Sequence, residues 1–125
     1  MLMRNEVNKK AVEYFYSSND ERFNTLDPDQ CQLLKCLINY LEVKGCKTTL
    51  FIPPYHPLTY QLFQQSTEAK GIFEAELFIK QNFKNQKIIG GTSPLELGLS
   101  ASDFYDGVHL KPEIIEQVLK DNSME

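Results

Sequence analysis

A carboxylate and a histidine stand three residues apart near the end of the chain, at Asp106 and His109. An imidazole is an effective general base when a carboxylate fixes its tautomer and stabilises the imidazolium that forms. The two residues flank a glycine-containing turn, and Lys111-Pro112-Glu113 then leads into a helix. The spacing predicts a base and its orienting carboxylate within hydrogen-bond reach, about 2.6–3.2 Å.

The same residue types also have ordinary structural interpretations. Asp106 can brace the turn before the last helix, His109 can be a hydrogen-bonded surface histidine, and His56, between tyrosine and proline, can brace a loop. Asp103, Asp106 and His109 carry metal-ligating groups. Three ligands on so short a stretch, without a clear fourth, do not favour a metal site, so neither a metal nor another cofactor is expected.

The segment Asp106-Gly107-Val108-His109-Leu110 resembles the last conserved block of the SGNH (GDSL-like) hydrolases, in which an Asp-x-x-His pair serves a nucleophilic serine. This resemblance implies catalytic roles for Asp106 and His109. Upstream, Leu50-Phe51-Ile52-Pro53-Pro54-Tyr55-His56-Pro57 resembles the strand and Pro-rich loop of membrane-associated SGNH-like proteins that handle acyl groups on cell-envelope polymers. The second resemblance implies that Tyr55 and His56 bind substrate. Together the two cover residues 27–120 and imply the flavodoxin-like three-layer SGNH fold, with ester hydrolysis or O-acyl transfer as its chemistry.

The serine nucleophile of that family has no counterpart here. No Gly-Asp-Ser occurs, and all six glycines stand at position 45 or later. Gly91-Thr92-Ser93-Pro94-Leu95 is not a nucleophile elbow either, because Leu95 takes the place of the second glycine that this strained turn needs. The sequence therefore predicts a partial domain, the C-terminal half of such a hydrolase, that is inactive alone.

Composition limits the remaining function classes. A chain of 125 residues with 42% hydrophobic and 24% charged residues is typical of one globular domain. The net charge of −4 argues against a nucleic-acid or anionic-membrane surface, since both need clustered Lys and Arg. Cys31, Cys36 and Cys46 lack metal or disulfide spacing, and the first two are expected as small buried residues of a helix.

The elements alternate between helix and strand. Asp27-Pro28 begins a helix that runs to about Lys44, where Gly45 supplies a left-handed stop. A strand at residues 47–52 ends at two prolines, and a second is expected at residues 87–89. Helical patterns cover residues 58–83, with a break near Gly71, and residues 112–120. The core-facing positions expected on these helices are Leu34, Leu37, Ile38, Leu41, Ile72, Phe73, Leu77, Phe78, Ile79, Ile114, Ile115, Val118 and Leu119.

This order predicts an α/β fold with a parallel sheet and flanking helices. Functional residues of such sheets lie beyond the carboxyl ends of the strands, so Tyr55-His56 and Asp106-His109 are expected along one edge. Residues 1–125 form a single domain in this reading. Residues 1–26 have no assigned element type, and residues 121–125 form a tail.

Two function classes remain open. In the first, the chain carries the base and orienter of an esterase or O-acyltransferase, and a missing N-terminal half supplies the serine. In the second, it is a non-catalytic interaction or structural module. Either class leaves a sheet edge exposed, so the expected partner is that N-terminal half or a second copy. No signal-peptide core or membrane span occurs, so the chain as written is expected in the cytoplasm, although full-length relatives in the family are membrane- or envelope-associated.

Overall fold

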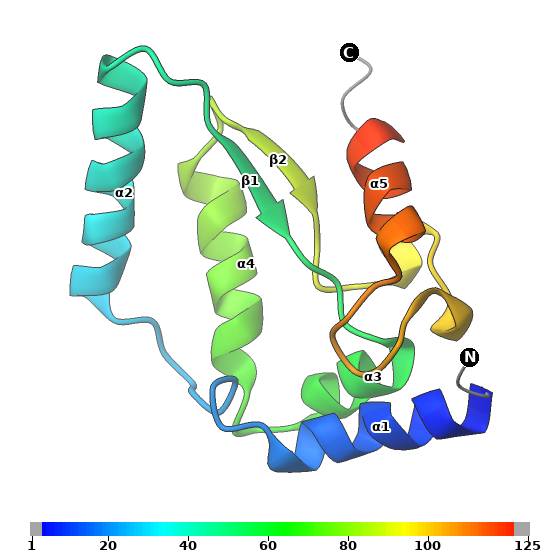
Figure 1. Cartoon of the computed structure of the whole chain (residues 1–125). Coiled ribbons are helices and arrows are strands. Elements are labelled where there is room, and N and C mark those ends of the chain that lie inside the picture. Colours follow the sequence, from blue (N-terminus) through cyan, green and yellow to red (C-terminus); the bar gives the residue numbers. More distant parts are fainter. Residues whose placement is uncertain (1–3, 122–125) are drawn as a thin grey trace.

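The computed structural model describes residues 4–121 (Figure 1). Within that range, α-helices surround a small parallel sheet, which confirms the expected mixed α/β class. In chain order the elements are α1 (Arg4–Ser17), α2 (Pro28–Val43), β1 (Thr49–Ile52), α3 (Pro57–Gln65), α4 (Lys70–Asn82), β2 (Lys87–Gly90), the short 3₁₀ helices η1 (Leu95–Leu97) and η2 (Ala101–Asp103), and α5 (Pro112–Asp121).

The sheet has two strands, and its register brings the carboxyl ends of β1 and β2 together. Thr49 pairs with Lys87 and Ile52 pairs with Gly90 in a parallel ladder. A side chain at Gly90 would meet the carbonyl oxygen of Ile52 at 2.2 Å, and φ there is +88°. Glycine is therefore required at the point where β2 leaves the sheet.

Helix α2 begins and ends as the sequence predicts, but its apolar face is only partly covered. Asp27 accepts a hydrogen bond from the Asp29 N–H at 2.9 Å, and Gly45 has a φ of +88°. Ile38 is buried, whereas Leu37 is 51% exposed, which corrects its expected place in the core. Cys36 is exposed as well, since α2 meets the rest of the chain along one side only (Figure 1).

The helical pattern of residues 58–83 is interrupted near Gly71, as expected, at residues 66–69. Gly71 lies in the first turn of α4, where a Cβ would meet the Phe23 ring at 2.1 Å and its N–H donates to the Phe23 carbonyl at 2.7 Å. This glycine serves close packing and does not break the helix. Leu77, expected in the core, is 54% exposed on α4.

The ends of the chain are more helical than the sequence indicates. The segment whose type was left open contains α1, which packs against α3, and Asp121 of the expected tail is the last residue of α5. Residues 1–3 and 122–125 lie outside the described residues.

Two hydrophobic clusters stabilise the fold. One lies under α5 and the other between α1, α3 and α4; Leu119 of α5, expected in the core, is 39% exposed. The buried members are Ile89, Leu99, Phe104, Leu110 and Val118 in the first cluster and Phe63, Ala69 and Ile72 in the second.

Candidate functional site

The predicted hydrogen bond between Asp106 and His109 is present. Oδ2 of Asp106 lies 2.7 Å from Nδ1 of His109, and Oδ1 accepts the N–H groups of Val108 at 2.9 Å and His109 at 2.8 Å. One carboxylate thus fixes both the backbone of the turn and the imidazole ring. The His109 side chain is 72% exposed, so the ring is accessible from solvent.

Opposing effects set the pKa of Asp106. Partial burial alone would raise it, because a charged carboxylate is less stable away from water. The hydrogen bonds from the Val108 N–H, the His109 ring and the His109 N–H outweigh burial and lower the pKa of Asp106 below its ordinary value. Asp106 is accordingly a carboxylate at neutral pH, the form that orients an imidazole.

The dyad turn, defined as residues 105–109, stands on a short antiparallel bridge between Phe104 and Leu110, both buried. The Tyr105 N–H donates to the His109 carbonyl at 2.8 Å, and the Lys111 N–H donates to the Asp103 carbonyl at 2.9 Å. Buried apolar residues on both sides therefore hold the turn in place, and Tyr105 and His109 are its exposed members.

Gly107 presses the dyad turn against α1 and α3. A Cβ at this position would lie 2.7 Å from Cβ of Tyr14 and 2.9 Å from Oγ1 of Thr59. The Thr59 hydroxyl is buried and donates to the Ala11 carbonyl at 2.8 Å, which joins α3 to α1 behind the turn. Only glycine leaves room for this contact.

The loop after β1 meets the dyad turn, as expected for residues at the carboxyl ends of parallel strands. The His56 N–H donates to the Gly107 carbonyl at 2.9 Å, and the Tyr55 N–H donates to the Thr92 carbonyl at 3.1 Å. Thr92 is held in turn by the Glu76 carboxylate, which accepts its N–H at 2.8 Å and its hydroxyl at 2.7 Å. The loop after β1 is therefore hydrogen-bonded both to the residues that follow β2 and to the dyad turn.

The two residues predicted to bind substrate differ in accessibility. The His56 ring is fully buried, accepts the Leu58 N–H on Nδ1 at 3.0 Å at the start of α3, and packs edge-on to Phe104 with centroids 5.6 Å apart. Tyr55 is partly buried, and its ring packs edge-on to Phe63 at 5.1 Å. Burial and the nearby Glu21 carboxylate raise the pKa of Tyr55 to about 12, so its phenol is neutral at physiological pH.

The sequence does not predict that Tyr14, Thr59 and Glu76 support the site from α1, α3 and α4. They bond to or contact residues 16 to 93 positions away, and no local pattern marks such pairs. Gly107, between the carboxylate and the histidine, is the one available signal, since a glycine often marks a close approach of two segments.

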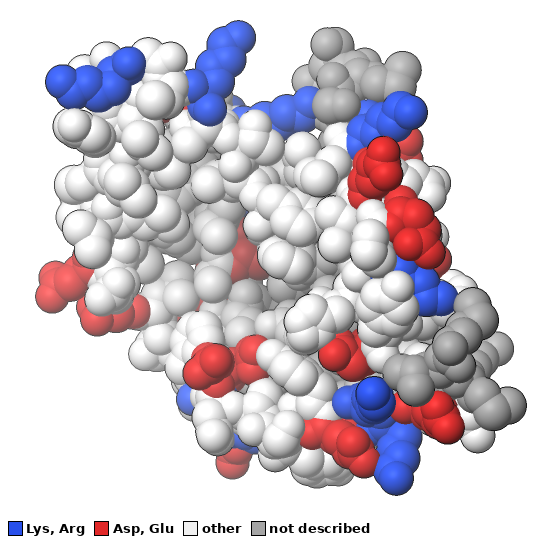
Figure 2. Space-filling model, in the orientation of Figure 1, with Lys and Arg blue, Asp and Glu red and all other residues white. Residues whose placement is uncertain are grey.

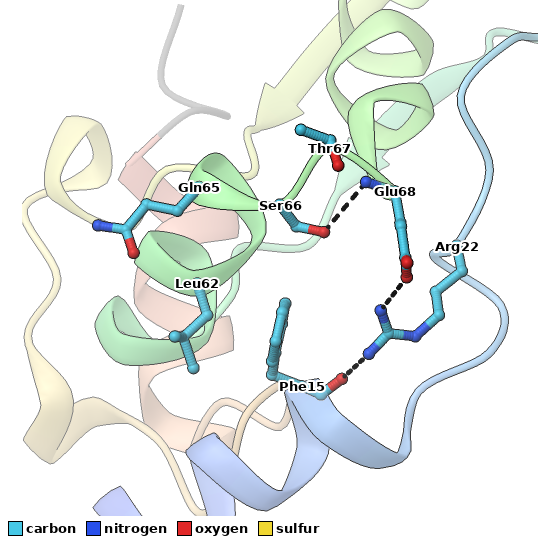
Figure 3. Close-up of a pocket in the computed structure, with 7 residues that line it drawn as sticks. All are labelled: Phe15, Arg22, Leu62, Gln65, Ser66, Thr67 and Glu68. Atoms are coloured by element: carbon cyan, nitrogen blue, oxygen red, sulfur yellow. Dashed lines mark hydrogen bonds and ion pairs between the residues drawn. The ribbon is translucent and has the colours of Figure 1, made fainter.

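A separate, open surface pocket of about 380 Å³ lies between the ends of α1 and α3 and the segment that precedes α4 (Figure 3). Its Arg22 donates to the carbonyls of Ser18 and Phe15 at 2.8 and 2.9 Å and to Glu68 at 2.9 Å. These hydrogen bonds link the end of α1 to the segment before α4 through the Arg22 guanidinium. None of the lining residues belongs to the dyad turn; they are Phe15, Arg22, Leu62, Gln65, Ser66, Thr67 and Glu68.

On the face shown in Figure 2, acidic and basic side chains are scattered, and the hollowed surface beside α2 is mostly uncharged, with a few acidic atoms visible inside it. Among residues 4–121, no group of three or more His, Cys, Asp or Glu side chains could hold a metal ion. None of the helices in that range is both long and apolar enough to cross a membrane.

Comparison of the chain with models of protein families, with curated proteins and with solved structures gives no match.

Proposed function

We propose that this chain is the base-bearing part of an SGNH-like esterase or O-acyltransferase. The observation that carries the proposal is the 2.7 Å contact between Oδ2 of the partly buried Asp106 and Nδ1 of the exposed His109 ring. When Nδ1 donates to the carboxylate, the neutral ring has its lone pair on Nε2. That nitrogen can take a proton from an attacking hydroxyl, and Asp106 then stabilises the imidazolium.

The nucleophile has to come from outside the described residues in this mechanism. Within residues 4–121, no hydroxyl or thiol hydrogen-bonds to His109. The nearest serines before His109 in the sequence, Ser100 and Ser102, bond to one another at 2.9 Å, and Ser100 also contacts Asp103. A serine supplied by a partner completes the reaction, as the resemblance to the SGNH family implies.

The open edge of β1 is the proposed place for that partner. The Ile52 carbonyl accepts the Gly91 N–H, so Ile52 directs its backbone groups toward β2. Backbone groups alternate sides along a strand, so Thr49 and Phe51 direct theirs toward the open edge. An edge with free N–H and C=O groups is a template for an added strand.

The position of the dyad turn sets the direction of that strand. The turn is bound to the loop that follows β1, through the His56 N–H and the Gly107 carbonyl. A partner strand running parallel to β1 ends at this same side of the sheet, about 4.8 Å from β1. A serine directly after that strand lies at the end of the sheet where the dyad turn lies, whereas an antiparallel strand would bring its amino end there.

The test uses a fluorophosphonate probe, which labels activated serines. Purified chain is added to an extract of its source cells, with His109→Ala and Asp106→Ala chains as matched controls. We expect a protein with a reactive serine to co-purify with the chain. Its labelling by the probe should require the wild-type chain and should fall with either variant. Equal labelling with wild-type and variant chains, or no labelled partner, would contradict it.

A non-catalytic interaction module is the second candidate. The observation that favours it is the uncovered apolar stripe of α2, in which Leu33, Leu37, Tyr40 and Val43 are 51–75% exposed. Contiguous exposed apolar surface is typical of protein-binding sites. In this case a partner binds equally well to wild-type and His109→Ala chains, and its fluorophosphonate labelling does not depend on His109.

A further inference from the structure

The His56 ring has an unusual place for a titratable group. The ring is fully buried and packs against Phe104 at the base of the dyad turn. The backbone N–H of His56 donates to the Gly107 carbonyl at 2.9 Å. The residue links the start of α3 to the turn that carries Asp106 and His109.

The hydrogen bonds of this ring select one protonation state. Nδ1 accepts the Leu58 N–H at 3.0 Å, so in the neutral ring the hydrogen is on Nε2. Nε2 is buried and has no hydrogen-bond partner. A second proton would have to bind Nδ1, where two donors, Nδ1–H and the Leu58 N–H, would then face each other. Protonation therefore breaks the cap of α3 and leaves a buried cation.

The charged groups around the ring only partly offset the cost of placing a second proton on it. Asp106, on the dyad turn, is the charged group whose field acts on His56 and favours the protonated form, but burial outweighs it and lowers the pKa of His56. Tyr55, next to it in the loop, and Tyr14, which contacts Gly107 from α1, have raised pKa values and stay neutral. They offer no charge to compensate a buried imidazolium.

We propose that neutral His56 is a positioning residue for the Asp106–His109 turn, and that protonation of its ring releases the turn. A charged ring moves toward water, and its backbone N–H leaves the Gly107 carbonyl. The structural step stands by itself; its effect on activity rests on the function proposed above. Acidification would then misplace the base through His56, in addition to any protonation of His109 itself.

Amide hydrogen exchange read by NMR tests the structural step without any activity. Protection of the His56 and Leu58 amides, corrected for intrinsic exchange rates, is followed from about pH 7.5 to pH 5, together with the ring carbon shifts of both histidines. His56→Asn is the key variant, since its Oδ1 can accept the Leu58 N–H and asparagine is a good helix cap that does not titrate. His109→Asn is the matched control.

We expect protection of the two amides to fall by up to about tenfold per pH unit, as one bound proton requires. The midpoint should match that of the His56 ring in wild-type and His109→Asn chains, and His56→Asn should show no such loss. Protection that persists while the His56 ring is charged would overturn the proposal. So would a His56 ring that stays neutral until the whole chain unfolds, or an equal loss in His56→Asn. If that variant does not fold, the midpoints in the other two chains decide. The fluorophosphonate test at neutral pH is independent of all these results.

Discussion

Replacing Gly107 with alanine adds one methyl group where the dyad turn touches the rest of the chain. The new Cβ would lie 2.7 Å from Cβ of Tyr14 and 2.9 Å from Oγ1 of Thr59, whereas non-bonded carbons in good contact are about 3.5–4.0 Å apart. Neither neighbour can move easily. Cβ of Tyr14 is fixed to the backbone of α1, and the Thr59 hydroxyl donates to the Ala11 carbonyl at 2.8 Å.

Two costs combine in the Gly107→Ala chain. Overpacking of this kind costs about 1–3 kcal/mol, and the upper half of that range applies because the Tyr14 contact involves a backbone-anchored atom. Displacing Thr59 from its buried hydrogen bond adds about 1 kcal/mol. We therefore expect the free energy of unfolding to fall by about 3 kcal/mol, equivalent to a Tm about 10 °C lower for a chain of this length.

Urea unfolding followed by circular dichroism measures this difference. Gly98→Ala is the control, because Gly98 has a φ of +71° and nothing within 4 Å of an added Cβ. Its cost is backbone strain alone, about 1 kcal/mol. If Gly107→Ala unfolds within about 0.5 kcal/mol of the wild-type chain, the dyad turn is not pressed against α1 and α3, and the support inferred for the site is wrong.

Three more outcomes follow from the site and the sheet. The isolated chain should hydrolyse p-nitrophenyl acetate no faster than His109→Ala, because no described residue offers His109 a nucleophile; turnover well above that control would contradict this. Since the pKa of Asp106 is lowered from 3.8, its stabilising effect should be complete above that value and be lost as the pH falls through the folded-state pKa. At pH 6 the free energy of unfolding of Asp106→Asn should therefore be lower than that of the wild-type chain by about 1.5–3 kcal/mol. Urea titrations should also show that the stability of this variant depends less on acid. Equal stability of the two chains at pH 6 would show that the carboxylate does not brace the turn. Light scattering after size exclusion should show association that weakens on dilution, because a two-stranded sheet has open edges, whereas a concentration-independent monomer with a cooperative melt would favour the self-sufficient interaction module.

Local chemistry in the sequence predicts a substantial part of this molecule. The Asp27 cap and the Gly45 stop bound α2 because both act on neighbouring backbone groups. The two strands and their parallel pairing follow from short apolar runs separated by helices. The hydrogen bond of Asp106 to His109 is also local, since three residues separate the two side chains.

The sequence does not predict which apolar side chains are buried or which distant residues hold the site in place. Periodicity identifies an apolar side of a helix but not what covers it, so Leu37 and Leu77 are exposed although the pattern places them in the core. The break expected near Gly71 lies at residues 66–69, but the sequence does not indicate that Gly71 itself makes room for the Phe23 ring, which stands 48 residues earlier in the chain.

The sequence by itself determines the dyad and its turn, because backbone geometry and short hydrogen bonds bring Asp106 and His109 together over three residues. Only the tertiary structure decides what holds that turn in place. It buries His56 without a partner for Nε2, ties its N–H to Gly107, and sets Tyr14 and Thr59 against the same glycine. These contacts join segments that are far apart in sequence, and packing between distant elements leaves no periodic trace along the chain.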